Sequence, residues 1–340
     1  RVVDVADPSH PKEIGSAYTM HYAFQVTIHG QHAYIAAGGA GLLIADVSNP
    51  ARPIETASVD TPGYAYGTSV AGNTAYVADG WEGIAVIDVA DQAHPALIAS
   101  GRTDGWAMDV HASGATLYVA AGPAGLRVVD VSNPRQPVEL GGYQTASGQY
   151  IGLSVADRMV YLADRIFGVR AVDASEPAKP VAAGFYPTLA IAGAVATSGN
   201  LAYVSTERGG VWTVDVSDPE HPRQIGRYDM IGYGECVAAS GRFVYAFGTD
   251  FSSASGLHVL DASDPANPKR VAFLSHPEGA CRDMELRDGI LYTSTEHNLV
   301  LFDVSNPLKP VQAGLVRLVD WPEPDRATIG VAVAGGFAYV

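Results

Sequence analysis

Residues 67–102 read GTSVAGNTAYVADGWEGIAVIDVADQAHPALIASGR, and this stretch decides the fold. It contains four short apolar runs separated by turns rich in Gly, Asn and Pro. The runs are too short and too often broken for helices, so they predict four strands, here called A to D: GTSVAG, TAYVAD, GIAVIDVA and ALIASGR. Strands that are almost continuously apolar are typical of sheets buried on both faces.

The same unit recurs along the chain. One landmark is an apolar run that ends in Asp before a Pro-containing turn; its members are Asp4, Asp46, Asp88, Asp130, Asp173, Asp215, Asp261 and Asp303. They are 42, 42, 42, 43, 42, 46 and 42 residues apart. The second landmark is a Tyr beside a small residue: Tyr34, Tyr76, Tyr118, Tyr161, Tyr203, Tyr245, Tyr292 and Tyr339. Eight alternating copies predict an all-β, eight-bladed β-propeller with four antiparallel strands per blade.

The two ends of the chain complete one blade. The sequence starts in a strand C at residues 1–4 and stops in a strand B at residues 339–340. We therefore predict that residues 327–340 and 1–18 form the last blade, which closes the propeller and removes free sheet edges. Residues 1–340 are then a single propeller domain. About seven residues of a regular unit are missing at this junction, so we expect the chain to be a segment of a longer protein.

The repeated aspartates have a structural explanation. Each precedes a turn, and its carboxylate can accept backbone N–H groups of that turn, so we predict that these eight residues are structural rather than catalytic. His10, His94 and His221 precede Pro in the same turns and receive the same interpretation.

Composition excludes some partners. The formal net charge is −15, and a surface this acidic repels nucleic-acid phosphates and anionic membranes. No run of 18 apolar residues exists, so we predict no direct membrane insertion. We expect the charge to attract cations or basic partners.

The two cysteines, Cys236 and Cys281, lie at similar positions within neighbouring repeats. One bridge between them is an open alternative, and two buried free thiols are the favoured interpretation. They lack the spacing of a metal site, and His29 and His32 offer two imidazoles without a third ligand, so we predict no metal and no cofactor.

Two segments carry a resemblance to a known family. Residues 71–90, AGNTAYVADGWEGIAVIDVA, and residues 117–143, LYVAAGPAGLRVVDVSNPRQPVELGGY, resemble LVIVD-repeat proteins, and the resemblance extends over all eight units. It implies an extracellular or cell-surface propeller that is often one module of a larger protein. It implies no catalytic residues.

Topology places the D–A and B–C loops on one face, which carries both main insertions, and variable loops on a rigid scaffold are where binding usually resides. Aromatic residues collect there, some at a recurring position before strand A and others in B–C loops or the last insertion. The predicted binding residues are Tyr22, Tyr64, Trp81, Trp106, Tyr233, Phe251 and Trp321. They either plug the channel mouth and pack between blades, or form a flat platform for a sugar or a protein partner.

A second candidate set is polar and lies where strands A begin. Asp109 and Asp283 share one repeat position, and Glu235, Arg282 and Arg326 lie close to the equivalent spot. A ring of these residues at the channel mouth could bind a cation or an anionic ligand. Most repeats, however, carry Gly, Ala, Gln or Cys there, and no hydrolase, zinc-protease or phosphate-binding motif occurs.

The leading hypothesis is a non-enzymatic extracellular or cell-surface binding or assembly module that presents its D–A and B–C loops to a protein partner or a surface glycan. One alternative is an enzyme, a hydrolase or lyase, with its site at the channel mouth; this rests on fold-level analogy. Another is a purely structural subunit of a larger surface complex.

Overall fold

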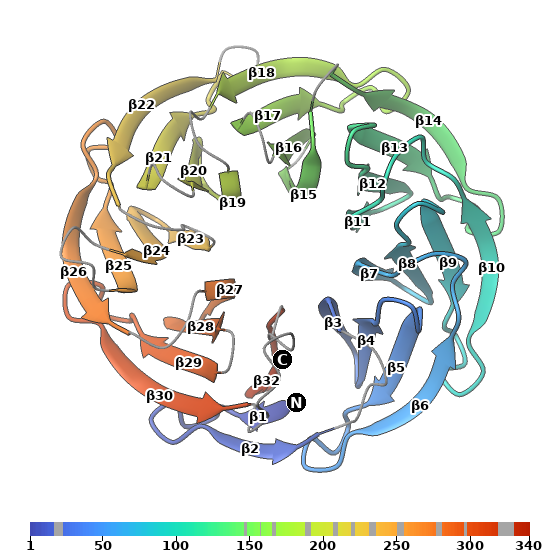
Figure 1. Ribbon diagram of the computed structural model, residues 1–340, viewed down its shortest axis with the longest axis horizontal. Coiled ribbons are helices and arrows are strands. Elements are labelled where there is room, and N and C mark those ends of the chain that lie inside the picture. Colours follow the sequence, from blue (N-terminus) through green and yellow to red (C-terminus); the bar gives the residue numbers. More distant parts are fainter. Residues whose placement is uncertain are drawn as a thin grey trace. The chain divides into compact units, whose positions relative to one another are not determined.

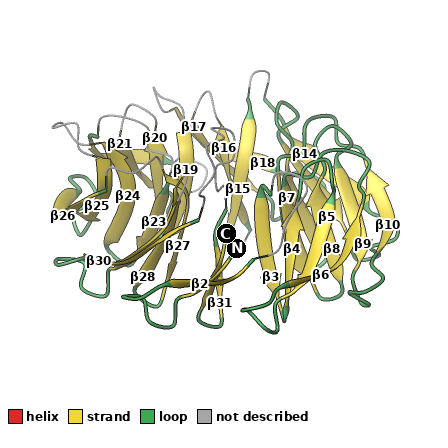
Figure 2. Ribbon diagram, turned by 60° about the horizontal axis from the view of Figure 1, so that its bottom comes forward, coloured by secondary structure: helices red, strands yellow, loops and turns green. Residues whose placement is uncertain are grey.

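The computed structural model describes residues 1–16, 23–145, 148–156, 158–164, 168–187, 192–206, 210–218, 222–230, 236–249, 255–276, 281–295, 298–318 and 330–340. These residues form strands joined by turns and loops, with no helix among them (Figure 2). The described part of the chain therefore offers no helix that could cross a membrane.

The strands form eight four-stranded antiparallel sheets, one for each predicted blade (Figure 1). Four blades lie within residues 25–187. They are β3 (Gln25–His29), β4 (His32–Ala36), β5 (Leu42–Asp46) and β6 (Ile54–Val59); β7 (Gly67–Ala71), β8 (Thr74–Ala78), β9 (Ile84–Asp88) and β10 (Ala96–Gly101); β11 (Asp109–Ser113), β12 (Thr116–Ala120), β13 (Leu126–Asp130) and β14 (Val138–Tyr143); and β15 (Tyr150–Ala156), β16 (Met159–Asp164), β17 (Gly168–Asp173) and β18 (Val181–Pro187).

Three further blades come from the second half. They are β19 (Ala192–Ser198), β20 (Leu201–Thr206), β21 (Gly210–Asp215) and β22 (Arg223–Tyr228); β23 (Val237–Ser240), β24 (Phe243–Thr249), β25 (Ser255–Asp261) and β26 (Lys269–Ser275); and β27 (Cys281–Arg287), β28 (Ile290–Thr295), β29 (Asn298–Asp303) and β30 (Val311–Arg317). The chain is therefore an eight-bladed β-propeller, as predicted, and strands β7 to β10 match the four strands predicted from residues 67–102.

The predicted composite blade is also confirmed. Its strands are β31 (Ala332–Ala334) and β32 (Phe337–Tyr339) from the end of the chain, and β1 (Val2–Asp4) and β2 (Lys12–Gly15) from its beginning, in the order β2-β1-β32-β31. Val2 pairs with Tyr339 and Asp4 with Phe337. The N-terminal amine donates a hydrogen bond of 2.7 Å to the carbonyl of Val340, which agrees with the adjacent N and C marks in Figure 1.

The chain divides into two compact units. One contains residues 1–13, 165–170 and 183–340, and the other contains residues 14–164 and 171–182. Each unit holds a consecutive series of blades, and the β15–β18 blade has strands in both. That residues 1–340 form a single domain stays a prediction.

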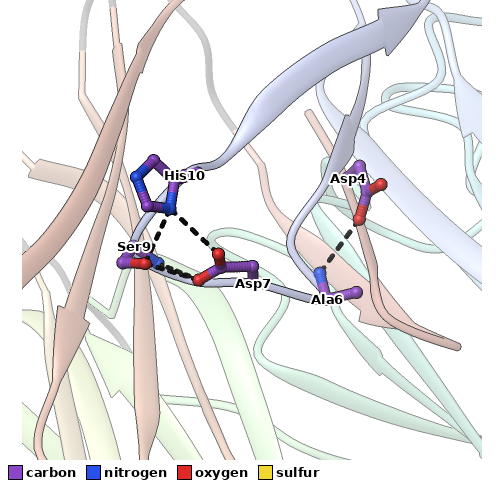
Figure 3. Close-up of polar contacts among 5 residues, drawn as sticks. All are labelled: Asp4, Ala6, Asp7, Ser9 and His10. Carbon is purple, nitrogen blue, oxygen red and sulfur yellow. Dashed lines mark hydrogen bonds and ion pairs between the residues drawn. The ribbon is translucent and has the colours of Figure 1, made fainter.

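The repeated aspartates organise the turn between strands C and D. In all eight copies a carboxylate oxygen accepts a hydrogen bond of 2.8–3.1 Å from the backbone N–H two residues further on, which confirms the structural interpretation. Figure 3 shows the first copy, in which Ala6 donates to Asp4. Hydrogen bonds from the following Ser lower the pKa of the carboxyl group at five of these positions, namely Asp46, Asp130, Asp173, Asp215 and Asp261.

A second acidic residue in the turn holds the histidine before Pro. Nδ1 of His10 lies 2.9 Å from Oδ2 of Asp7 (Figure 3), and Nδ1 of His94 lies 3.0 Å from Asp91. Hydrogen bonds from Ser9 and His10 lower the pKa of Asp7 to about 2. The predicted structural role of these two histidines is confirmed, whereas His221 lies outside the described residues.

The hydrophobic core lies between neighbouring blades. All eight repeated tyrosines are at most 6% exposed. In one cluster, Tyr34 and Ile44 of the β3–β6 blade pack with Val77 and Ile87 of the β7–β10 blade. Because these two sheets pack face to face, the facing sides of their strands B and C are apolar. Strands buried in this way lack the alternation of a half-exposed sheet.

The cysteines correct one prediction. Cys236 and Cys281 form a disulfide, with their Cα atoms 6.0 Å apart, so the favoured interpretation of two free thiols is wrong. Cys236 immediately precedes β23 and Cys281 begins β27. The two strands are the first strands of neighbouring blades, and this proximity brings together residues that are 45 positions apart in the sequence.

Candidate functional site

Five aromatic side chains form a continuous cluster, here called the aromatic shelf: Phe24, Tyr64, Tyr66, Trp81 and Trp106. Ring centroids of successive members lie 5.0–5.7 Å apart, within the range of attractive aromatic pairs. Trp81 stacks on Trp106 with an angle of 25° between the ring planes, whereas the remaining pairs are tilted or edge-on.

The outer end of the shelf faces solvent. Trp81 is 66% exposed and Tyr64 is 37% exposed. Phe24, Tyr66 and Trp106 are half-buried and pack against these two rings. Burial raises the pKa of the Tyr66 phenol, and the neighbouring Tyr64 acts in the same direction. A contact with Trp106 lowers this pKa by a smaller amount.

Loop pairing explains why these rings meet. Tyr64 and Tyr66 lie in the D–A loop between β6 and β7, Trp106 lies in the next D–A loop, and Trp81 lies in the B–C loop between β8 and β9. The backbone of Ala107 exchanges two hydrogen bonds, of 2.9 and 3.1 Å, with that of Gly80, and Ala65 pairs with Gly38 in the same way. Both of these D–A loops are thereby held against a B–C loop of the preceding blade.

Gly80 allows the close approach that this clamp requires. Its φ of +61° lies in the left-handed region, which favours glycine. A Cβ atom at this position would meet Nε1 of Trp106 at 3.1 Å and the ring of Tyr66 at 3.4 Å. The glycine therefore lets Trp81, the next residue, lie over Trp106.

A buried carboxylate anchors the adjoining loop. Asp79 is fully buried at the end of β8 and accepts hydrogen bonds of 2.6 Å from the hydroxyl of Thr61 and 2.8 Å from the N–H of Gly63. Burial raises the pKa of Asp79, with smaller contributions in the same direction from Glu82 and Asp60. The D–A loop that carries Tyr64 is thus tied to the B–C loop that carries Trp81.

Charged side chains border the shelf. Glu82, next to Trp81, accepts two hydrogen bonds from the guanidinium of Arg102, of 2.7 and 2.9 Å. Asp60 is exposed. The carboxylate of Asp104 lies 3.4 Å from Arg127, but 88% of the Asp104 side chain remains exposed.

The structure brings together three of the seven predicted aromatic residues: Tyr64, Trp81 and Trp106. Tyr22, Tyr233, Phe251 and Trp321 lie outside the described residues. Sequence reasoning missed Phe24 and Tyr66. The signal that could have found them is the period of two, because Phe24 and Tyr66 each stand two positions after a predicted aromatic and extended residues two apart share one side of the chain.

Two of the polar candidates, Asp109 and Asp283, accept hydrogen bonds from a neighbouring blade. Asp109 accepts hydrogen bonds from the N–H of Val110, at 2.9 Å, and from that of Leu153 in the next blade, at 3.2 Å. Asp283 does the same with Met284, at 2.8 Å, and with Val331 in the next blade, at 2.9 Å. These carboxylates therefore link the first strands of neighbouring blades.

Other side chains repeat this link. Glu285, two residues after Asp283 on β27, accepts a hydrogen bond of 2.8 Å from the N–H of Val333, and Ser69 accepts one of 3.1 Å from Ala112. Glu285 was missed in the sequence, although its alternation with Asp283 signals the shared side of β27. Arg282 is exposed and lies at a β-bulge between Cys281 and Asp283. Glu235 and Arg326 lie outside the described residues.

No cluster of three His, Cys, Asp or Glu side chains suited to a metal occurs among the described residues. His29 and His32 are directly opposite each other across the turn between β3 and β4. The arrangement of the described residues thus offers an exposed aromatic surface with acidic neighbours.

The repeat decides the family. Six stretches match the LVIVD repeat: residues 1–19, 21–61, 62–103, 104–145, 191–230 and 231–272. The chain belongs to the LVIVD-repeat family. Three of these stretches contain the whole aromatic shelf, so the shelf of this LVIVD-repeat protein is built from loops of the family repeat. No curated protein matches the sequence.

Solved structures share the fold at low sequence identity. The computationally designed Ika8 protein has a TM-score of 0.74 and 11% identity, over 95% of this chain and 94% of that one. Sqt1 of Saccharomyces cerevisiae has a TM-score of 0.76 and 8% identity, over 94% and 96%. A chain of a mitotic checkpoint complex has a TM-score of 0.57 and 15% identity, over 77% and 78%. At such identities these structures support the fold of the LVIVD-repeat protein alone.

Proposed function

We propose that this LVIVD-repeat protein is a non-enzymatic, extracellular binding module whose D–A and B–C loop face contacts its partner. The observation that carries the proposal is the aromatic shelf. The large ring of Trp81 is mostly exposed, yet stacking on Trp106 already restricts its orientation. It therefore loses little further conformational freedom when a partner covers it.

The hydrogen bonds that Asp109 and Asp283 accept support a binding role over a catalytic one. Asp109 and Asp283 each accept two backbone N–H groups, one of them from the next blade. A carboxylate in such a position satisfies backbone groups of a neighbouring strand, which is a structural task. We therefore place the functional contact on the loops rather than on these aspartates.

The disulfide supports an extracellular location. Cys236 and Cys281 are both 2% exposed and bridge two blades. Disulfides persist in oxidising environments and are rare in reducing cytosol.

Binding to a surface panel tests the proposal. The fluorescently labelled protein is applied to arrays of extracellular proteins and of glycans, beside the variants Trp81→Ala and Trp212→Phe. Trp212 is buried at 5% exposure in β21 and serves as the control for loss of a tryptophan at another site. We expect at least one array member whose signal Trp81→Ala abolishes and Trp212→Phe preserves. Signals that are equal for all three proteins would place the contact elsewhere.

A further inference from the structure

The outer face of Trp81 offers a prepared π surface. One face of its indole stacks on Trp106, and the side chain is still 66% exposed. The face of an aromatic ring is its negative side and attracts cations, most strongly in tryptophan. Tyr64, at 37% exposure, extends the same cluster toward the preceding blade.

The charges around this surface are mostly negative. The loops at 37–41, 60–66, 79–83, 102–108 and 121–125 contain the acidic residues Asp60, Asp79, Glu82 and Asp104, and a single cation, Arg102. That cation already donates two hydrogen bonds to Glu82. Asp60 is exposed, and the Asp104 side chain keeps 88% of its surface exposed while its carboxylate also pairs with Arg127 of β13 at 3.4 Å. Both carboxylates can therefore still be approached by a partner. The net charge of −15 adds a long-range field of the same sign.

From the exposed rings and their acidic border we propose that the aromatic shelf docks a lysine- or arginine-bearing segment of a protein partner. The proposal rests on the proposed function and names the chemistry of the partner. A guanidinium or ammonium group lies over the indole of Trp81, and Asp60 and Asp104 attract further basic side chains of the same segment. An anionic glycan is repelled by these carboxylates. A neutral sugar can donate hydroxyl hydrogen bonds to them but gains no attraction between opposite charges.

Soluble peptides provide the test. The probes are a peptide of alternating glycine and arginine, its lysine and glutamate counterparts, and a neutral cello-oligosaccharide. Binding is followed by tryptophan fluorescence and by calorimetry at low and high salt. We expect the arginine peptide to bind and Trp81→Ala to weaken its Kd roughly 3- to 30-fold, whereas Trp81→Phe, which keeps a ring, loses less.

A charge-matched pair separates the local border from the overall charge. Asp60→Asn/Asp104→Asn removes two charges beside the shelf, and Glu55→Gln/Glu176→Gln removes two exposed charges on β6 and in the turn before β18. We expect the first pair to weaken peptide binding about 2- to 5-fold at low salt, with a smaller difference at high salt, and the second pair to leave it nearly unchanged.

Three outcomes overturn the proposal. Equal weakening by the two charge pairs, with no effect of Trp81→Ala, would mean that overall acidity alone attracts the peptide. Trp81-dependent binding of the cello-oligosaccharide without peptide binding would make the shelf a sugar site, and the proposed binding function would stand. Absence of binding by either basic peptide would remove the basic segment as the occupant, while the array experiment decides separately whether this face binds anything.

Discussion

At the scale of single residues, side-chain carboxylates accept hydrogen bonds from backbone N–H groups that have no partner strand. The first strand of each blade has one edge without a neighbouring strand in its own sheet, and its N–H groups need acceptors. Asp283 accepts a hydrogen bond from the N–H of Val331, which immediately precedes the short strand β31. Glu285 accepts one from the N–H of Val333 within β31. Burial raises the pKa of both carboxyl groups, so the same residues that join two blades are costly to ionise.

The variant Asp283→Asn tests this cost. A pKa raised above its ordinary value of 3.8 means that the folded protein holds the proton more tightly than the unfolded chain does. The contribution of Asp283 to the free energy of unfolding is therefore fully present below that value and declines as the pH rises, until the carboxyl group has ionised in the folded protein. Asn cannot ionise, so we expect the stability of the variant relative to wild type to rise from about pH 3.5 to pH 7. Urea unfolding across this range measures it, and a flat difference would contradict it.

At the scale of elements, the fourth strands of four blades each contact a turn of the next blade. Four glycines in fourth strands, Gly15, Gly141, Gly226 and Gly314, lie directly against the C–D turn of a neighbouring blade. A Cβ atom at Gly226 would overlap the carbonyl oxygen of Pro265 and lie 2.8 Å from the backbone of Ala266. The repeated turn thus contacts both its own blade, through the aspartate, and the fourth strand of the blade before it.

A pair of glycine variants tests this contact. Gly226→Ala forces backbone against backbone, and we expect it to lower the free energy of unfolding by about 1–3 kcal/mol, as overpacking does. Gly101→Ala is the control, because it also lies in a fourth strand but its Cβ would meet only Ile84, at an ordinary 3.8 Å. We expect this control to change stability by no more than about 0.5 kcal/mol. Equal effects of the two variants in denaturant titrations would show that the turn can shift to make room for the methyl group without loss of stability.

At the scale of the whole molecule, repeated units are held mainly by their neighbours, as in other repeat proteins. The disulfide between Cys236 and Cys281 adds a covalent link between two adjacent blades. It constrains the unfolded chain as well as the folded one, because it closes a loop between residues 45 positions apart.

Breaking this link should loosen the blades that it joins. We expect Cys236→Ala/Cys281→Ala to lower the free energy of unfolding by about 2–5 kcal/mol. Reduction of the wild-type protein should give a similar loss without altering side-chain volume. Hydrogen exchange should rise first in β23 and β27. Unchanged unfolding in both experiments would mean that packing alone sets the stability of this region.

Much of this architecture was predictable because it is local and repeated. The spacing of the aspartates and tyrosines determines the number of blades, and the residues between them determine strands and turns, since each such preference acts over a few residues. The pairing of β1 and β2 with β31 and β32 was predictable because each end of the chain lacks the strands that the other end supplies.

The candidate site was predictable only in part. Trp81 stood out because its loop is irregular, but its stacking on Trp106 depends on two loops that are 25 residues apart and clamped through Gly80. The sequence by itself determined the repeat, the blade and the Asp-centred turns, because these arise from contacts between residues close along the chain. Only the tertiary structure decided the disulfide, the use of Asp109 and Asp283 as links between blades, and the aromatic shelf, because each depends on how one blade meets the next.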